Sequence, residues 1–131
     1  MSEPVETSDL APRLVVADGH AALSFYARAF DTEPTDHLYV GDRLVNAHVR
    51  LGTTVVGVTQ EDGAANRSPA TLGGTPVLLS LTVPDVDVAA ARFVDAGGEA
   101  VIPVDDRSYG RRDGRFRDPF GHLWILGQAL R

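Results

Sequence analysis

Two segments of the chain carry the same order of apolar and polar positions. An apolar run at 14–17 ends at Asp18, and apolar residues then recur at helical spacing from about 19 to 30. A second apolar run at 77–83 is followed by Asp85 and by another helical pattern. Aspartate is favoured at helix N-caps because its carboxylate accepts hydrogen bonds from the free amides of the first turn. Each segment is therefore predicted to form a strand followed by a helix.

Three strand patterns follow each predicted helix. They lie at 37–40, 44–51 and 54–59 in the first half and at 100–104, 114–118 and 122–127 in the second. Residue pairs that favour tight turns, such as Gly41-Asp42 and Asp113-Gly114, precede several of these strands. Each half thus has the order β-α-β-β-β.

A constant spacing of 67 positions relates the two halves. It maps Leu14 onto Leu81 and Asp18 onto Asp85, and such self-similarity indicates a duplicated unit. A four-stranded sheet with one helix leaves a face uncovered, so the two units are expected to associate. The predicted architecture is α+β, with two βαβββ repeats forming a curved mixed sheet around a cavity. The repeats are placed at about 10–60 and 75–128, joined by a linker at about 61–74, in a single domain of 10–131 after a flexible tail of 1–9.

The composition limits the cellular setting and the partners. The 131 residues give room for one ordinary domain. There is no cysteine, which excludes disulfides and thiolate metal ligands, and no apolar run is long enough to span a membrane. The acidic, polar residues 1–9 lack the pattern of a secretory signal, so a cytoplasmic location is expected. The net charge of -6 argues against a nucleic-acid partner, which requires a basic surface.

Arginine is concentrated in one segment. All twelve basic residues are arginine, and five of them lie within 107–117. The absence of lysine excludes Schiff-base chemistry, whereas clustered guanidinium groups are suited to binding carboxylate or phosphate. The alternative is a solvated loop in which the arginines pair with Asp105, Asp106 and Asp113.

Strand parity suggests where the polar groups point. In the strand at 44–51, Val49 and its apolar neighbours are expected to face a helix, which turns His48 and Arg50 toward the opposite, concave face. The spacing of 67 sends these two residues to Arg115 and Arg117. The predicted ligand-binding residues are Arg13, Asn46, His48, Arg50, Tyr109, Arg115 and Arg117. The alternative is an internal charge network with Asp42, Asp113 and Asp118, or plain exposure.

Several motifs resemble those of a known family. Leu14–Asp18 with Ser24-Phe25-Tyr26 is similar to the first strand and helix of the vicinal oxygen chelate superfamily, the glyoxalase/bleomycin-resistance/dioxygenase proteins. The linker 68–76, together with Tyr109-Gly110 and the closing motif at 117–122, resembles its PhnB-type branch. The resemblance implies the paired βαβββ fold over about residues 10–128. Within the closing motif, Asp118 is interpreted as shaping the turn before Pro119.

The same resemblance bears on metal binding. Enzymes of the superfamily usually hold a divalent metal with four side chains, two from each repeat. In this sequence the matching positions are Ala11, Gly57, Leu78 and Ile125, none of which can ligate a metal. No cofactor is therefore expected.

Three functions remain open at this point. The first is a metal-independent small-molecule binding protein of the glyoxalase/bleomycin-resistance type, which sequesters an anionic metabolite or antibiotic. The second is a divergent enzyme, a lyase, isomerase or dioxygenase, with non-standard metal or acid-base residues; His48 is the candidate base and Arg50 or Arg115 would stabilise an oxyanion. The third is an interaction module without chemistry. A homodimer is expected in each case, because strand edges and a sheet rim need cover.

Overall fold

The computed structural model describes residues 3–130. Met1 and Ser2 of the predicted tail, and Arg131 at the end of the predicted domain, lie outside the described residues. The first repeat comprises β1 (Arg13–Val16), α1 (Gly19–Phe30), β2 (Thr35–Val40), β3 (Arg43–Leu51) and β4 (Thr54–Gln60). The second comprises β5 (Leu78–Thr82), α3 (Val86–Asp95), β6 (Glu99–Asp106), β7 (Arg111–Arg117) and β8 (Leu123–Ala129). Within the linker lies one short helix, α2 (Pro69–Leu72), which the residue pattern did not predict.

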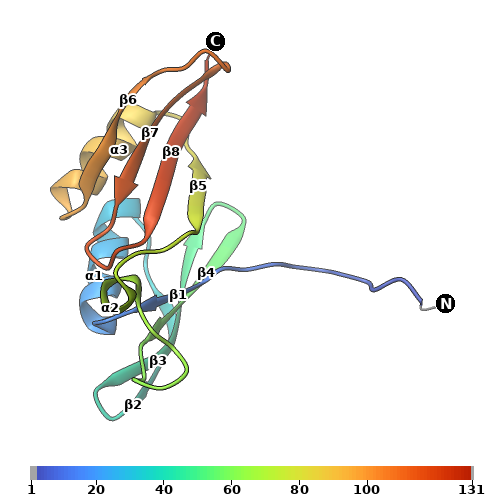
Figure 1. Cartoon of the computed structure of the whole chain (residues 1–131), viewed down its shortest axis with the longest axis vertical. Coiled ribbons are helices and arrows are strands. Elements are labelled where there is room, and N and C mark those ends of the chain that lie inside the picture. The colour runs from blue at the N-terminus through green and yellow to red at the C-terminus, as the bar shows by residue number, and fades with distance from the viewer. Residues whose placement is uncertain (1–2, 131) are drawn as a thin grey trace.

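The strands form two four-stranded mixed sheets. Their orders are β1-β4-β3-β2 and β5-β8-β7-β6, and in each sheet the first strand pairs in parallel with the last strand of its repeat. Figure 1 shows the sheets one above the other along the length of the molecule, with α1 and α3 together on one side. The predicted α+β fold with two βαβββ repeats is confirmed, but the two sheets do not close around one cavity within the chain.

The duplication extends to individual hydrogen bonds at the helix N-termini. Asp18 accepts from the amide of Ala21, and Asp85 accepts from the amide of Val88. In addition, Gln60 on β4 caps the first amide of α1, and Gln128 on β8 does the same for α3. The predicted caps are therefore confirmed, and each is supported by a glutamine from the last strand of its own repeat.

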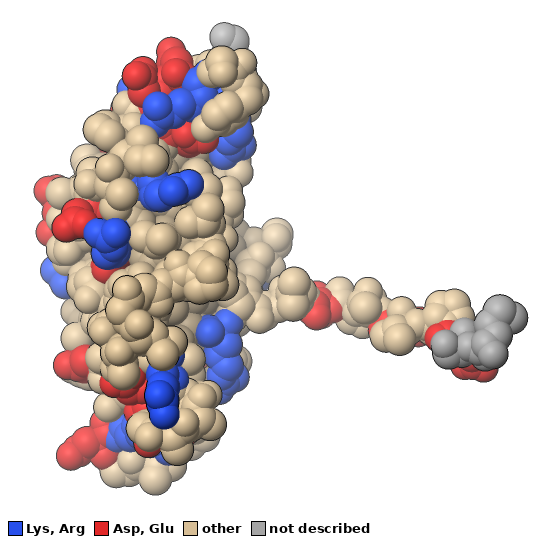
Figure 2. All heavy atoms as spheres, in the orientation of Figure 1, with Lys and Arg blue, Asp and Glu red and all other residues tan. Residues whose placement is uncertain are grey.

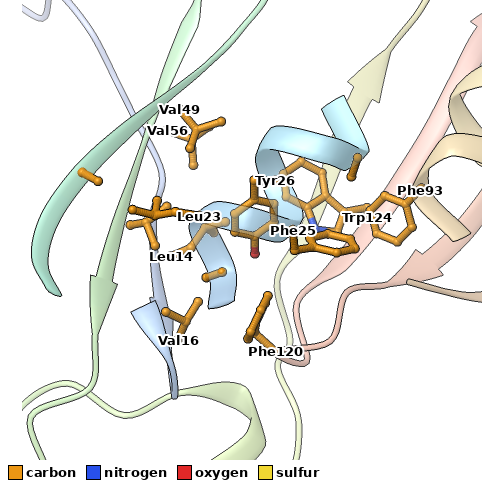
Figure 3. Close-up of a cluster of buried hydrophobic side chains, with 14 of the residues drawn as sticks. Leu14, Val16, Leu23, Phe25, Tyr26, Val49, Val56, Phe93, Phe120 and Trp124 are labelled. Atoms are coloured by element: carbon orange, nitrogen blue, oxygen red, sulfur yellow. The ribbon is translucent and has the colours of Figure 1, made fainter. Parts of the chain in front are cut away.

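The two helices share one core. Figure 3 shows Tyr26 of α1 lying between the aliphatic side chains of the first sheet and Trp124 and Phe93 of the second repeat. The ring of Phe30 lies 4.9 Å from that of Trp124, and the ring of Phe25 lies 5.2 Å from that of Phe93. Such edge-on and tilted aromatic pairs add to the free energy of burying the rings. The repeats are thus joined through their helices rather than through a shared sheet.

The other segments between residues 3 and 130 add no further helix or strand. Residues 3–12 form neither helix nor strand, and the side chains of 3–11 are exposed. Between residues 3 and 130, no helix is both long and apolar enough to cross a bilayer.

Candidate functional site

The strand register determines which side chains leave the helix-covered side of each sheet. Val49 pairs with Val56, and both are buried in the core; His48 pairs with Gly57 on the other side. In the second sheet Phe116 is buried, while its neighbour Arg115 faces away from α3. The predicted parity is therefore confirmed in both repeats. We call the side that bears His48 and Arg115 the open face.

A cavity of about 280 Å³ lies on the open face of the second sheet. Its lining comes from β6, β7, β8 and the β6–β7 turn: Ile102, Arg107, Tyr109, Asp113, Gly114, Arg115 and Ile125. Gly114 is needed here, because a Cβ at this position would lie 2.8 Å from the carbonyl oxygen of Ile102. We call this cavity the Arg115 pocket.

One wall of the Arg115 pocket is an internally satisfied ion pair. Asp113 is buried and accepts a hydrogen bond from Arg107 Nε at 3.1 Å and another from the Tyr109 hydroxyl at 2.8 Å. The hydrogen bond to Asp113 raises the pKa of the Tyr109 phenol, so this hydroxyl stays protonated at neutral pH. The negative charge of Asp113 offsets the positive charge of Arg107, because the two side chains form an ion pair.

Arg115 has no such partner. Within residues 3–130, no carboxylate oxygen lies within 4.0 Å of its guanidinium, and its buried Nε makes no hydrogen bond. A buried donor without an acceptor is costly unless a ligand or water completes it. The Arg115 pocket thus combines one uncompensated cation with apolar walls from Ile102 and Ile125.

Two of the predicted binding residues, Tyr109 and Arg115, line this pocket. The others lie elsewhere. Arg117 pairs with Glu99. His48 Nδ1 lies 2.9 Å from Asp36 Oδ2, and this contact lowers the pKa of Asp36.

The remaining three predicted residues also lie outside the Arg115 pocket. Asn46 donates to the Asp36 carbonyl at 3.5 Å, and Arg13 donates to the Val45 carbonyl at 3.4 Å. Arg50 lines a separate groove between the repeats. Within a single chain, therefore, the predicted binding residues of the two repeats do not meet in one space.

Many of the other charged side chains form ion pairs with each other. Arg112 bonds both Asp87 and Asp106, and Figure 2 shows acidic and basic side chains side by side near the end of the molecule where the C-terminus lies. The alternative interpretation, in which the arginines pair with Asp105, Asp106 and Asp113, thus holds for Arg107 and Arg112. Arg117 pairs instead with Glu99, and Arg115 makes no ion pair among residues 3–130.

Sequence reasoning missed five residues of the pocket wall: Ile102, Arg107, Asp113, Gly114 and Ile125. The family resemblance singled out Ile125, but only as a position that lacks a metal ligand. Arg107 and Asp113 belonged to the charged segment, and their alternation around a Gly-containing turn was the available signal. Ile102 lies on β6, whose pairing with β7 shifts register twice, so simple alternation could not locate it.

The family model of the Glyoxalase/Bleomycin resistance protein/Dioxygenase superfamily matches residues 9–126. The chain belongs to this superfamily. The Uncharacterized protein Mb0911c of Mycobacterium bovis is 42% identical over 127 residues, covering 93% of this chain and 84% of that protein. TioX from Micromonospora sp. ML1 has a similar structure, with a TM-score of 0.72, 25% identity and coverage of 95% and 98% of the two chains. Protein PA1353 from Pseudomonas aeruginosa shows the same fold at 20% identity, with a TM-score of 0.76 and coverage of 95% and 100%.

The metal site that the superfamily resemblance implies does not fit these residues. Gly57 pairs with His48 and Arg13, and Ile125 pairs with Arg115, so both positions lie on the open face without a ligating atom. A Cβ added at Gly57 would lie 3.2 Å from Arg13 Cγ, which shows that an arginine side chain covers the position. Across the described part of the chain, no three His, Cys, Asp or Glu side chains gather as a metal-binding group.

Proposed function

We propose that this superfamily member is a metal-independent small-molecule binding protein whose Arg115 pocket takes an anionic ligand. The observation that carries the proposal is the unpaired guanidinium of Arg115, with its buried Nε, in a cavity on the open face. A carboxylate or phosphate oxygen would supply the missing acceptor through a charge-assisted hydrogen bond.

The other walls restrict the ligand further. At about 280 Å³ the pocket is at the small end of ligand sites, which favours a metabolite over a large antibiotic. Ile102 and Ile125 offer apolar contact to the carbon skeleton, and the protonated Tyr109 presents a hydroxyl oxygen as an acceptor. We therefore propose a small carboxylate or phosphate ester with a short apolar part, which the protein sequesters.

Finer assignments belong to the same proposal. The closing motif supports the PhnB-type branch, and the composition supports a cytoplasmic location. A homodimer is supported by the exposed apolar side chains of Leu78 and Ile102, which are 43% and 41% exposed on the open face. Such a dimer would cover that face with a second copy of the chain.

A divergent enzyme is the second candidate, and one contact favours it. The hydrogen bond between His48 and Asp36 resembles the base and orienting carboxylate of many acid-base sites. Both side chains are exposed, at 39% and 67%, and neither lines the Arg115 pocket. An exposed His48 has no pocket in which to hold a substrate. We therefore propose catalysis by His48 only if a second copy of the chain encloses it.

Native mass spectrometry of the untagged protein against a panel of metabolites and antibiotics tests the proposal. We expect a bound small anion whose mass is unchanged after incubation. Elemental analysis of the same sample should show no stoichiometric divalent metal. About one Zn, Ni, Mn or Fe per chain would contradict metal independence. Conversion of the bound compound would favour the enzyme.

A further inference from the structure

The duplicated fold creates two equivalent boundaries between the repeats, which we call seams. At each seam the end of the helix of one repeat lies next to the start of the helix of the other repeat. The first seam lies between the end of α1, the β3–β4 turn, the end of β5 and the start of α3. The spacing of 67 places its counterpart between the end of α3, the β7–β8 turn, the end of β1 and the start of α1. Because the repeats share one fold, the two seams should have matching shapes. A group that fills one seam and is missing from the other then indicates what kind of ligand the empty seam can hold.

The second seam is filled by an aromatic ring from the chain itself. Phe120, in the β7–β8 turn, is only 8% exposed, and its ring lies 6.1 Å from that of Phe25 and 6.0 Å from that of Tyr26. The linker helix α2 packs directly against this turn: a Cβ added to Gly121 would lie only 2.8 Å from Pro69 Cβ.

The first seam has no such filling. Its turn, Gly52-Thr53, is one residue shorter than Pro119-Phe120-Gly121 and carries no aromatic side chain. A groove of about 680 Å³ remains there, with apolar walls that include Phe30, Leu51, Val83 and Val88. The volume is within the range of small-molecule sites. We call this space the open seam.

The charges around the open seam favour an anion at one end. Arg92 is engaged by Asp31 at 3.3 Å and by the Arg28 carbonyl at 2.7 Å. The Arg50 carbonyl, on the opposite wall, accepts a hydrogen bond from the Thr32 hydroxyl, but the Arg50 guanidinium makes no ion pair or hydrogen bond with any residue that the structure describes. Asp85 also lines the seam, and its carboxylate accepts the hydrogen bond of the Val88 amide at the start of α3. A ligand in the seam would therefore meet the Arg50 guanidinium, which no described carboxylate engages, beside an apolar slot.

We propose that the open seam is a second binding site, separate from the Arg115 pocket, for a small aromatic carboxylate. The aromatic ring takes the place that Phe120 occupies in the equivalent seam, and the carboxylate pairs with Arg50. The filled seam supplies the reason for an aromatic group, and the unpaired arginine supplies the reason for the acid.

Phenylacetate is the probe for this site, because it carries a benzyl group like that of Phe120 and a carboxylate. We expect titration of the ¹⁵N-labelled full chain to shift the amide resonances of Leu51, Gly52 and Val88 saturably, with a dissociation constant on the order of 1 mM. Arg50→Gln should raise this constant about tenfold, because the charge-assisted contact is lost. Arg43→Gln is the matched control, since Arg43 lies at the other end of β3 and also makes no ion pair among the described residues.

Neutral phenylacetamide tests the role of the carboxylate on the wild-type chain, so this comparison does not depend on whether a variant folds. It should bind the wild-type chain more weakly than phenylacetate, and Arg50→Gln should not weaken it further. Shifts confined to Gly114 and Arg115 would overturn the proposal while supporting the Arg115 pocket. Absence of shifts at about 10 mM phenylacetate, or equal binding by Arg50→Gln and wild type, would also overturn it. Arg115→Gln should leave the phenylacetate-induced shifts of Leu51, Gly52 and Val88 unchanged even if it abolishes shifts at Gly114, so the two sites fail or succeed separately.

Discussion

Asp118 is the polar residue through which the closing turn is tied to both repeats. It is 2% exposed and accepts hydrogen bonds from the Tyr26 hydroxyl, Trp124 Nε1 and the amides of Phe120 and His122. The two amide contacts confirm that it shapes the turn. The bonds to Tyr26 and Trp124 could not be predicted, because they join side chains that are brought together only by tertiary packing.

The buried Tyr26 gives this network a pH dependence. Burial, and then the charge of Asp118, raise the pKa of the Tyr26 phenol well above its ordinary value. The folded state therefore keeps this proton after the unfolded chain has lost it. The stabilising contribution is full below pH of about 10 and is lost as pH rises from there toward the folded pKa, at up to about 1.4 kcal/mol per pH unit.

Tyr26→Phe isolates that contribution. At neutral pH the variant should be less stable by about 1 kcal/mol, the net value of one hydrogen bond. Above pH of about 10 the difference from wild type should shrink, because the variant has no phenol at this position to lose a proton. Urea unfolding from neutral to alkaline pH measures this, and a difference that stays constant would contradict the buried, protonated Tyr26.

At the scale of elements, the strands and helices could be predicted because their signals are local. The aspartate caps, the helical spacing and the alternation in β3 and β7 each depend on a few neighbouring residues. The start of β7 was predicted wrongly: Asp113-Gly114, taken as a turn, lies within the strand, and the chain turns at 107–110 instead. Edge strands β2 and β6 were harder to place, since both pair with register shifts. The site was predictable only in part: parity placed Arg115 correctly, whereas the Arg107–Asp113–Tyr109 contacts depend on the conformation of a turn.

The two faces of β3 and β7 should differ in their effect on stability. Phe116→Ala should lower the free energy of unfolding by about 3–5 kcal/mol and Val49→Ala by about 1–3 kcal/mol, because each leaves a cavity in the core. His48→Ala should change it by less than about 1 kcal/mol, since the contact with Asp36 is exposed. Equilibrium denaturation with guanidinium chloride provides the comparison. A large loss for His48→Ala with a small one for Phe116→Ala would show the strand register to be wrong.

For the whole molecule, the arrangement of the two repeats was beyond sequence reasoning. The prediction that both halves contribute to one cavity required their open faces to converge, and in the single chain they do not. Parity determines which face a residue occupies but carries no information on how two sheets are oriented to each other. That orientation depends on how the aromatic side chains of α1 pack against the second repeat.

Dimer formation is the corresponding prediction. Leu38, Tyr39 and Val40 on edge strand β2 are 56%, 42% and 63% exposed, and the open face adds further apolar area that a second copy can bury. Light scattering at micromolar concentration should give about twice the chain mass of 14.0 kDa. A mass near that of one chain would contradict the homodimer.

Calorimetric titration of the Arg115→Gln variant with the ligand identified by native mass spectrometry tests anion binding at the Arg115 pocket most directly. The variant should bind at least about tenfold more weakly than wild type, a loss of about 1.4 kcal/mol, because the charge-assisted hydrogen bond is gone. Arg43→Gln should bind as wild type does. Unchanged affinity in Arg115→Gln, or an equal loss in both variants, would contradict a site at Arg115.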